Sequence, residues 1–125
     1  MNLPERIKQL VASHFDEMVI TRRHLHRHPE LSFEEFETTK FIANTLNKYG
    51  YDLQKITETG GYIDIQGKNP LKKIIALRGD IDALPIHEKS DQEYASIHDG
   101  KMHACGHDVH ITCLLGAIQV LHSLK

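Results

Sequence analysis

Cysteine is scarce in this chain of 125 residues, which has only Cys105 and Cys113. Two cysteines, one expected in a loop and one inside a helix, do not make the disulfide framework that staples small secreted domains. Cys113 lies between Thr112 and Leu114, and we interpret it as a small buried apolar residue of a helix. Cys105 is the cysteine of chemical interest because of the residues around it.

The chain also lacks a charge bias and a long apolar run. Its net charge is -2 with histidine neutral, and Lys and Arg alternate with Asp and Glu, so no basic face predicts binding to nucleic acid or to an anionic membrane. The N-terminus has no basic stretch followed by an apolar core, and no apolar run has the length of a bilayer span. We therefore expect a cytoplasmic protein whose partners include neither nucleic acid nor a membrane.

What the chain does contain is the composition of a globular protein, 40% hydrophobic and 26% charged, at a length suited to one domain. The spacing of apolar residues predicts a first helix over residues 4–27, which a proline then stops. Ser32 and Glu35 have the spacing of a capping box, which predicts the start of a second helix running towards Tyr49. Gly50 supplies the end of that helix.

Three short segments after the second helix have strand character, at Asp52–Ile56, Tyr62–Gln66 and Lys73–Leu77. Glycine-rich turns separate them, the second turn being Gly67–Pro70. The third segment ends in a continuous apolar run, which predicts a central strand covered on both faces.

Residues 78–102 are loop-like, and a third amphipathic helix is expected from about His107. The order of elements predicts an α/β fold, with polar residues beyond the carboxyl ends of strands, where such folds place their sites. The sheet is incomplete, and a further strand is expected where the chain stops at Lys125. An unpaired sheet edge and uncovered apolar surface would favour self-association or aggregation.

The richest chemistry lies in the nine residues from Met102 to His110, which hold three histidines, a cysteine and an aspartate. In an extended segment residues two apart point the same way, so His103, Cys105 and His107 can face one point in space. Thiolate and imidazole ligands suit zinc or a neighbouring divalent transition metal, and three protein ligands with an open position form a catalytic arrangement. The alternative is a set of ordinary surface or hydrogen-bonded histidines.

Four stretches of the chain carry a family resemblance together, in this order: Arg22–Ser32, Leu77–Ile86, Gly100–Met102 and His103–His110. They closely resemble the N-terminal part of the M20 metallopeptidase family. The resemblance is to its amidohydrolase branch, which includes N-acyl-amino-acid amidohydrolases, hippurate hydrolases and auxin-conjugate hydrolases. Such a match spans nearly the whole chain.

The resemblance implies a two-domain enzyme with an aminopeptidase-like, zinc-peptidase α/β catalytic domain and an inserted smaller domain for dimerisation and lidding. Residues 1–125 would form the first part of the catalytic domain, with flanking helices on an incomplete sheet. The rest of that domain and the inserted domain would lie outside these residues. The implied reaction is hydrolysis of the amide bond of an N-acyl-L-amino acid by metal-activated water.

By motif position, Cys105 and His107 resemble the first metal ligands of the family. The implied cofactor is a divalent transition metal (zinc, manganese, cobalt or nickel), with one or two ions in the complete enzyme. The glutamate that takes the proton of the attacking water belongs, in the family, to a paired-glutamate motif beyond the third helix. We therefore expect no catalytic residue in these 125 residues, which should be inactive alone. The alternative is a non-enzymatic remnant or a metal-binding module.

Two aspartates follow the third predicted strand. Asp80 has the place of the aspartate in the superfamily's His-x-Asp motif, but Arg78 stands where the histidine would be. We therefore expect Asp80 and Asp82 to orient a ligand or to fix the loop rather than to bind metal directly.

For three further residues near the candidate ligands, the sequence does not decide between a role in the site and a purely structural role. Asp108 either hydrogen-bonds a ligand histidine or caps the third helix, and capping is the more ordinary role. His110 lies one helical turn after His107 and can share its face. His103 is a motif residue without an assigned ligand role.

His24, His26 and His28 form a second histidine cluster. In a helix His24 and His28 share a face and His26 points elsewhere, so these three do not predict a metal site. The resemblance makes this segment a structural signature beside the core. Glu88 and Glu93 are interpreted as ordinary solvated charges of the loop.

Overall fold

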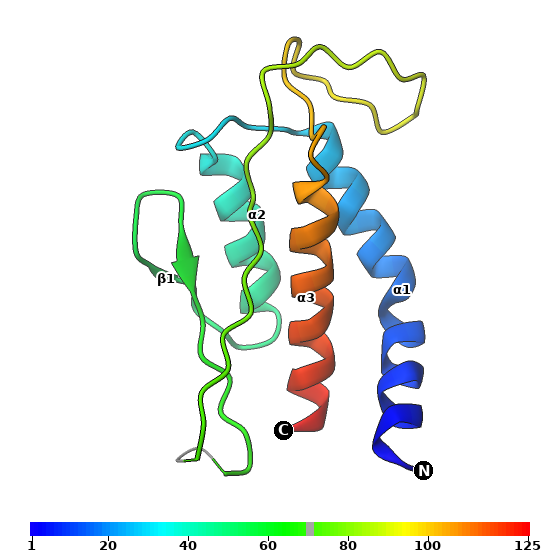
Figure 1. Cartoon of the computed structure of the whole chain (residues 1–125), viewed down its shortest axis with the longest axis vertical. Coiled ribbons are helices and arrows are strands. Elements are labelled where there is room, and N and C mark those ends of the chain that lie inside the picture. Colours follow the sequence, from blue (N-terminus) through cyan, green and yellow to red (C-terminus); the bar gives the residue numbers. More distant parts are fainter. Residues whose placement is uncertain (70–71) are drawn as a thin grey trace.

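The computed structural model describes residues 1–69 and 72–125 (Figure 1). Its elements are three helices, α1 (Leu3–Arg27), α2 (Phe36–Asn47) and α3 (His107–Leu124), and the two short strands β1 (Gln54–Lys55) and β2 (Gly61–Tyr62). The strands pair in antiparallel register. In Figure 1 α3 lies between α2 and α1, and the extended segment after β2 runs along the α2 side.

The first helix forms as its periodicity predicts. Asn2 caps it, because its side chain accepts from Glu5 N at 3.0 Å while the Glu5 carboxylate accepts from Asn2 N at 3.3 Å. Pro4 lies in the first turn, where no backbone donor is needed. The helix ends at Arg27, just before Pro29. The predicted helix over residues 4–27 is confirmed.

The capping box predicted at Ser32 and Glu35 is wrong. The backbone makes a turn there, with Phe33 at φ +67°, and this turn separates Ser32 from α2. No side chain of the N-cap residue bonds to the first turn of α2. Instead the Glu30 carboxylate accepts from the backbone N–H of Thr38 at 2.5 Å and from its hydroxyl at 2.6 Å. A carboxylate at a helix N-terminus is favoured by the unpaired donors and by the dipole.

Gly50 ends the second helical segment as predicted. It has φ +81°, and its N–H bonds to Asn47 O at 3.0 Å while Tyr51 N bonds to Leu46 O at 3.2 Å. These two bonds form a Schellman motif, which places glycine in the left-handed conformation.

The three predicted strands form only in part. The first segment contains β1, whereas β2 overlaps the second segment only at Tyr62, and each strand has two residues. Lys73–Leu77 forms no strand in the described part of the chain, and the prediction of a central strand covered on both faces is wrong there. Ile74, Ile75 and Leu77 are 94%, 82% and 58% exposed, because no described strand lies beside them. The predicted turn at residues 67–70 ends in Pro70, which lies outside the described residues.

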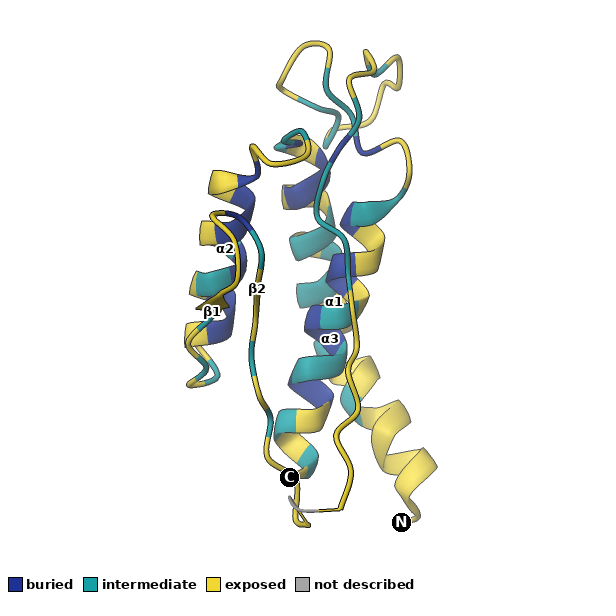
Figure 2. Cartoon of the chain, turned by 60° about the vertical axis from the view of Figure 1, so that its left-hand side comes forward, coloured by how far each residue is buried: buried dark blue, intermediate teal, exposed yellow. Residues whose placement is uncertain are grey.

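The core lies where α1, α2 and α3 meet, and Figure 2 shows the buried residues along the facing sides of the helices. Its buried members are Leu25, Ile42, Leu46, Ile111 and Leu115. Cys113, which we expected to be buried, is exposed. The helical period explains this, because Thr112, Leu115 and Gly116 point inward and leave Cys113 on the outer side. Among the described residues, no helix has the length and apolar character needed to cross a membrane.

Candidate metal-binding site

The segment before α3 is a turn and not an extended strand. Met102 pairs with Leu84 through two backbone bonds of 2.9 and 3.0 Å, and the chain then turns through Cys105 and Gly106 into α3. Gly106 has φ +78°, a conformation that glycine adopts without strain. We call residues 78–106, which run from the extended segment to this turn, the site loop. In Figure 1 it lies at the end of the molecule where α1 ends and α3 begins.

The turn overrides the alternation expected for an extended segment. His103 is buried and Cys105 is exposed, so they do not face one point together with His107. Over residues 1–69 and 72–125, no group of three His, Cys, Asp or Glu side chains is arranged to hold a metal. The prediction of a site built from His103, Cys105 and His107 alone is therefore wrong.

His107 is held by Asp82, which is the contact expected of a metal-binding histidine. Its Nδ1 lies 2.9 Å from Asp82 Oδ1 and 3.0 Å from Asp82 O. Since both neighbours only accept, Nδ1 carries a proton, and in the neutral ring the lone pair lies on Nε2. This carboxylate–histidine pair fixes both the ring and the tautomer of metal-ligating histidines. This contact is of the orienting kind, one of the two roles expected for Asp82.

Cys105 supplies a second donor near His107. Its thiol is free and exposed, and only Gly106 separates the two residues in the chain. A thiolate and an imidazole Nε2 form a donor pair that suits zinc and its divalent neighbours. The residues present thus fit part of a metal site, two ligands of the three or four that such an ion takes. That Cys105 and His107 bind metal remains a prediction.

Asp80 lies at the surface. Its carboxylate accepts from Arg78 Nε at 2.9 Å, and both side chains are open to solvent. This contact fixes the start of the site loop locally.

Asp108 has neither of the two roles considered for it. Gly106 is the N-cap residue of α3, and no side chain caps that helix. The Asp108 carboxylate is fully buried and accepts from Arg22 Nε at 3.0 Å and from His26 Nδ1 at 2.7 Å. Its partners lie on α1, so it joins the start of α3 to that helix.

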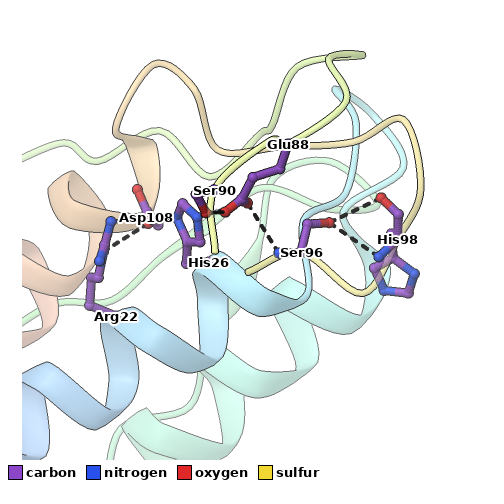
Figure 3. A network of polar contacts seen from close by, with 7 residues as sticks. All are labelled: Arg22, His26, Glu88, Ser90, Ser96, His98 and Asp108. Atoms are coloured by element: carbon purple, nitrogen blue, oxygen red, sulfur yellow. Dashed lines mark hydrogen bonds and ion pairs between the residues drawn. The ribbon is translucent and has the colours of Figure 1, made fainter. Parts of the chain in front are cut away.

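Glu88 is part of the same network, and its interpretation as a solvated charge is wrong. Its side chain is only 3% exposed, and its carboxylate lies 3.0 Å from His26 Nε2 and 3.1 Å from Ser96 N (Figure 3). The Ser90 hydroxyl donates to its other oxygen. Burial raises the pKa of Glu88, but the hydrogen bonds from Ser90 and Ser96 and the charge of His26 together bring it below its ordinary value. Glu93 is exposed, as expected.

His103 is buried, and neither ring nitrogen has a hydrogen-bond partner in the described part of the chain. Burial lowers the pKa of His103, against the opposing attraction of Asp108. A buried polar group without a protein partner is a common place for a water or an ion. His110 is exposed, and its ring centroid lies 5.8 Å from that of His107, so these two residues share a face as predicted.

The second histidine cluster divides as the helical period predicts. The rings of His24 and His28 lie 4.4 Å apart, and His24 stacks on Phe41 at 4.1 Å. Burial, and then the charge of His28, lower the pKa of His24. His26 points elsewhere, into the buried network with Asp108.

Known proteins are similar to this chain in sequence. The family model described as "Peptidase family M20/M25/M40" matches residues 76–125. The N-acyl-L-amino acid amidohydrolase of Geobacillus stearothermophilus is 43% identical over 122 residues, which are 97% of this chain and 33% of that protein. The N-acetyl-L-cysteine deacetylase of Bacillus subtilis is 52% identical over 97% of this chain and 27% of its own length.

A solved structure is similar in fold over most of this chain. The YXEP protein of Bacillus subtilis, described as a dinuclear metal-binding peptidase of the M20 family, superposes with a TM-score of 0.82 at 40% identity. The match covers 93% of this chain and 32% of that one. This chain belongs to the M20 peptidase family.

Within the M20 family the chain lies on the amidohydrolase and deacetylase branch, and it spans about a third of the length of its relatives. The family resemblance drawn from the motifs is confirmed. The fold is confirmed in part, because the three helices and the small hairpin match part of an M20 structure.

Proposed function

We propose that this chain is part of a metal-dependent amidohydrolase that hydrolyses the amide bond of N-acyl amino acids. The observation that carries the proposal is the contact of Asp82 with His107 Nδ1, which leaves Nε2 available two residues along the chain from the exposed thiol of Cys105. The amidohydrolase and deacetylase names of the relatives support the substrate class. Because the chain spans about a third of their length, the activity and substrate of the whole protein are part of the proposal.

In this proposal, some residues of the chain bind the metal and others position its ligands. Cys105 Sγ and His107 Nε2 bind the ion, which is zinc, manganese, cobalt or nickel, alone or as one of two. Asp82 keeps the His107 ring in one orientation and one tautomer, so that Nε2 has no proton to lose before it binds. When bound, such an ion polarises an amide carbonyl and activates water. The ring of His103, two residues before Cys105, is buried.

Metal binding by the purified chain tests the proposal. Calorimetric titration with zinc should give a binding curve for wild type that is lost in Cys105→Ala and in His107→Ala. Cys113→Ala is the matched control, because Cys113 is an exposed free cysteine on α3 without a proposed role. Equal binding in all four proteins, or loss in the control alone, would reject the assignment of Cys105 and His107.

A further inference from the structure

A buried cluster of charged side chains joins three parts of the chain beside the proposed metal ligands. His26 of α1 lies between two carboxylates, with Nδ1 2.7 Å from Asp108 of α3 and Nε2 3.0 Å from Glu88 of the site loop (Figure 3). The side chains of Asp108 and Glu88 are 0% and 3% exposed. Arg22, one turn before His26, donates to the same Asp108 oxygen at 3.0 Å. We call these four residues the His26 clamp.

Both ring nitrogens of His26 face carboxylate oxygens, which only accept, and Arg22 Nη2 also lies 3.5 Å from Nδ1. A neutral imidazole has one donor and one acceptor nitrogen, and the acceptor would then face a carboxylate oxygen. A protonated ring donates to both carboxylates, and with Arg22 it balances the two negative charges of Asp108 and Glu88. Buried charges are retained where they are paired and hydrogen-bonded in this way. Tyr94 covers the cluster, with its ring edge-on to His26 at 5.6 Å and under the Arg22 guanidinium at 5.0 Å.

The clamp holds the same two parts of the chain that form the proposed metal site. Asp108 directly follows His107 in the first turn of α3. Glu88 belongs to the site loop, which also carries Asp82 and Cys105. Glu88 also holds two other residues of the loop, since it accepts from Ser90 and Ser96 as well as from His26.

Few other described bonds tie the site loop to the helices. On α1, Arg27 O accepts from Ile97 N at 3.0 Å and Arg27 Nη1 donates to Glu93 O at 3.3 Å, and after α1 Glu30 O accepts from Ala83 N at 2.8 Å. The described part of the loop contains no helix and no strand longer than a single bridge. Besides the backbone bond of the neighbouring Ala83, the position of Asp82 opposite His107 depends on side-chain contacts, of which the clamp is the most buried.

We propose that His26 and Glu88 are positioning residues, which hold the site loop against α1 and α3 so that Asp82 stays on His107 Nδ1. The link between this placement of Asp82 and metal binding rests on the proposed function. The clamp itself is a property of the chain without metal, and it can be measured separately.

The experiment compares the 125-residue wild type with Glu88→Gln and with the control Glu93→Gln, an exposed glutamate of the same loop. Glutamine keeps the size of Glu88 but removes its charge and half of its acceptors, so His26 and Ser96 lose a carboxylate. Amide hydrogen exchange in residues 83–102 should rise about tenfold or more in Glu88→Gln, since hydrogen bonds to charged groups are the strong ones. Exchange in the middle of α3 should not change, and Glu93→Gln should match wild type.

Two further readouts distinguish positioning from a general effect on stability. Nitrogen-15 spectra of the His107 ring should show the proton on Nδ1 in wild type and a mixture of tautomers in Glu88→Gln. Zinc affinity should fall about tenfold in Glu88→Gln, as it does when groups that orient a metal ligand are removed.

Each outcome decides a separate point. Unchanged exchange in Glu88→Gln, or an increase spread evenly over the loop and all three helices, would overturn the proposal. Loop-specific exchange together with a wild type that binds no zinc would support the clamp and reject the proposed function. If Glu88→Gln did not fold, Glu88→Asp, which keeps the charge but shortens the side chain, would be measured in the same way, and unchanged exchange in residues 83–102 would overturn the proposal.

Discussion

Asp82 and Asp80 are a natural pair for testing the role of a carboxylate beside His107. They lie two residues apart, but Asp82 contacts His107 whereas Asp80 pairs with Arg78 at the surface. We expect Asp82→Ala to weaken zinc binding by about 10- to 100-fold, because His107 then loses its fixed orientation and tautomer. Asp80→Ala should leave the affinity near that of wild type, since surface ion pairs contribute little. Calorimetry on the two variants checks this, and equal losses would contradict the distinction.

The lowered pKa of Glu88 predicts how the stability of the chain depends on pH. Its pKa in the folded chain lies below its ordinary value of 4.5, so folding favours the ionised form. The stability that it contributes is present above its ordinary pKa and is lost as the pH falls through the lowered value. Glu88→Gln should therefore be less stable than wild type near neutral pH, with a difference that narrows in acid.

Urea unfolding at a series of pH values measures this difference. Glu93→Gln is again the control, because Glu93 is exposed and should alter the curve little. A gap between wild type and Glu88→Gln that stays constant down to strongly acid pH would contradict the sign of the shift.

At the scale of single elements, periodicity predicts helices better than it predicts their starts. The helices follow from apolar spacing and from stop signals at Pro29 and Gly50, which act through local backbone geometry. The capping box at Ser32 failed because the turn at Phe33 intervenes, and a pattern of residue types does not contain that turn. The Glu30 carboxylate that does contact the start of α2 lies seven and eight residues before its partners.

Gly50 tests whether local backbone geometry ends a helix. Its φ of +81° costs any residue with a Cβ about 1–2 kcal/mol, although an added Cβ would meet no atom within 4 Å. Gly50→Ala should lower the free energy of unfolding by about this amount. Gly67→Ala is the matched control, because its added Cβ also meets nothing and its backbone is not left-handed. Thermal unfolding of both variants measures the difference, and equal melting temperatures would contradict the strain.

A strand depends on neighbours, which a single segment does not supply. Lys73–Leu77 has the apolar run of a buried strand, yet its side chains are exposed in the described structure. The pattern of apolar residues shows that a segment favours a sheet. The hydrogen bonds that form the sheet come from other strands, which the segment itself does not contain.

At the scale of the molecule, the motif near α3 predicted the candidate ligands because they lie within a few residues of one another. Asp82 was expected either to orient a ligand or to fix the loop, and it contacts His107. The His26 clamp was not predictable in this way. His26 lies 82 residues from Asp108 and 62 from Glu88, and no local pattern connects them.

The exposed apolar segment Lys73–Leu77 predicts the behaviour of the whole chain in solution. An unpaired extended segment with exposed Ile74 and Ile75 is a template for pairing with a second copy. We expect self-association that rises with concentration and that falls in Ile75→Lys, because a charge on such an edge opposes pairing. Light scattering measures it.

Ile97→Lys is the control for that prediction. Ile97 is 55% exposed but lies in the site loop, away from this segment. Equal reduction by both lysines would mean that general charge, and not pairing at residues 73–77, governs the association.

The most direct test of the account is the absorption spectrum of the chain with cobalt. If Cys105 and His107 bind the metal, wild type and Cys113→Ala should show a thiolate-to-cobalt absorption band that Cys105→Ala lacks, and His107→Ala should need far more cobalt to develop it. A band that survives in Cys105→Ala, or the absence of any band in wild type, would contradict the assignment of this turn as a metal site.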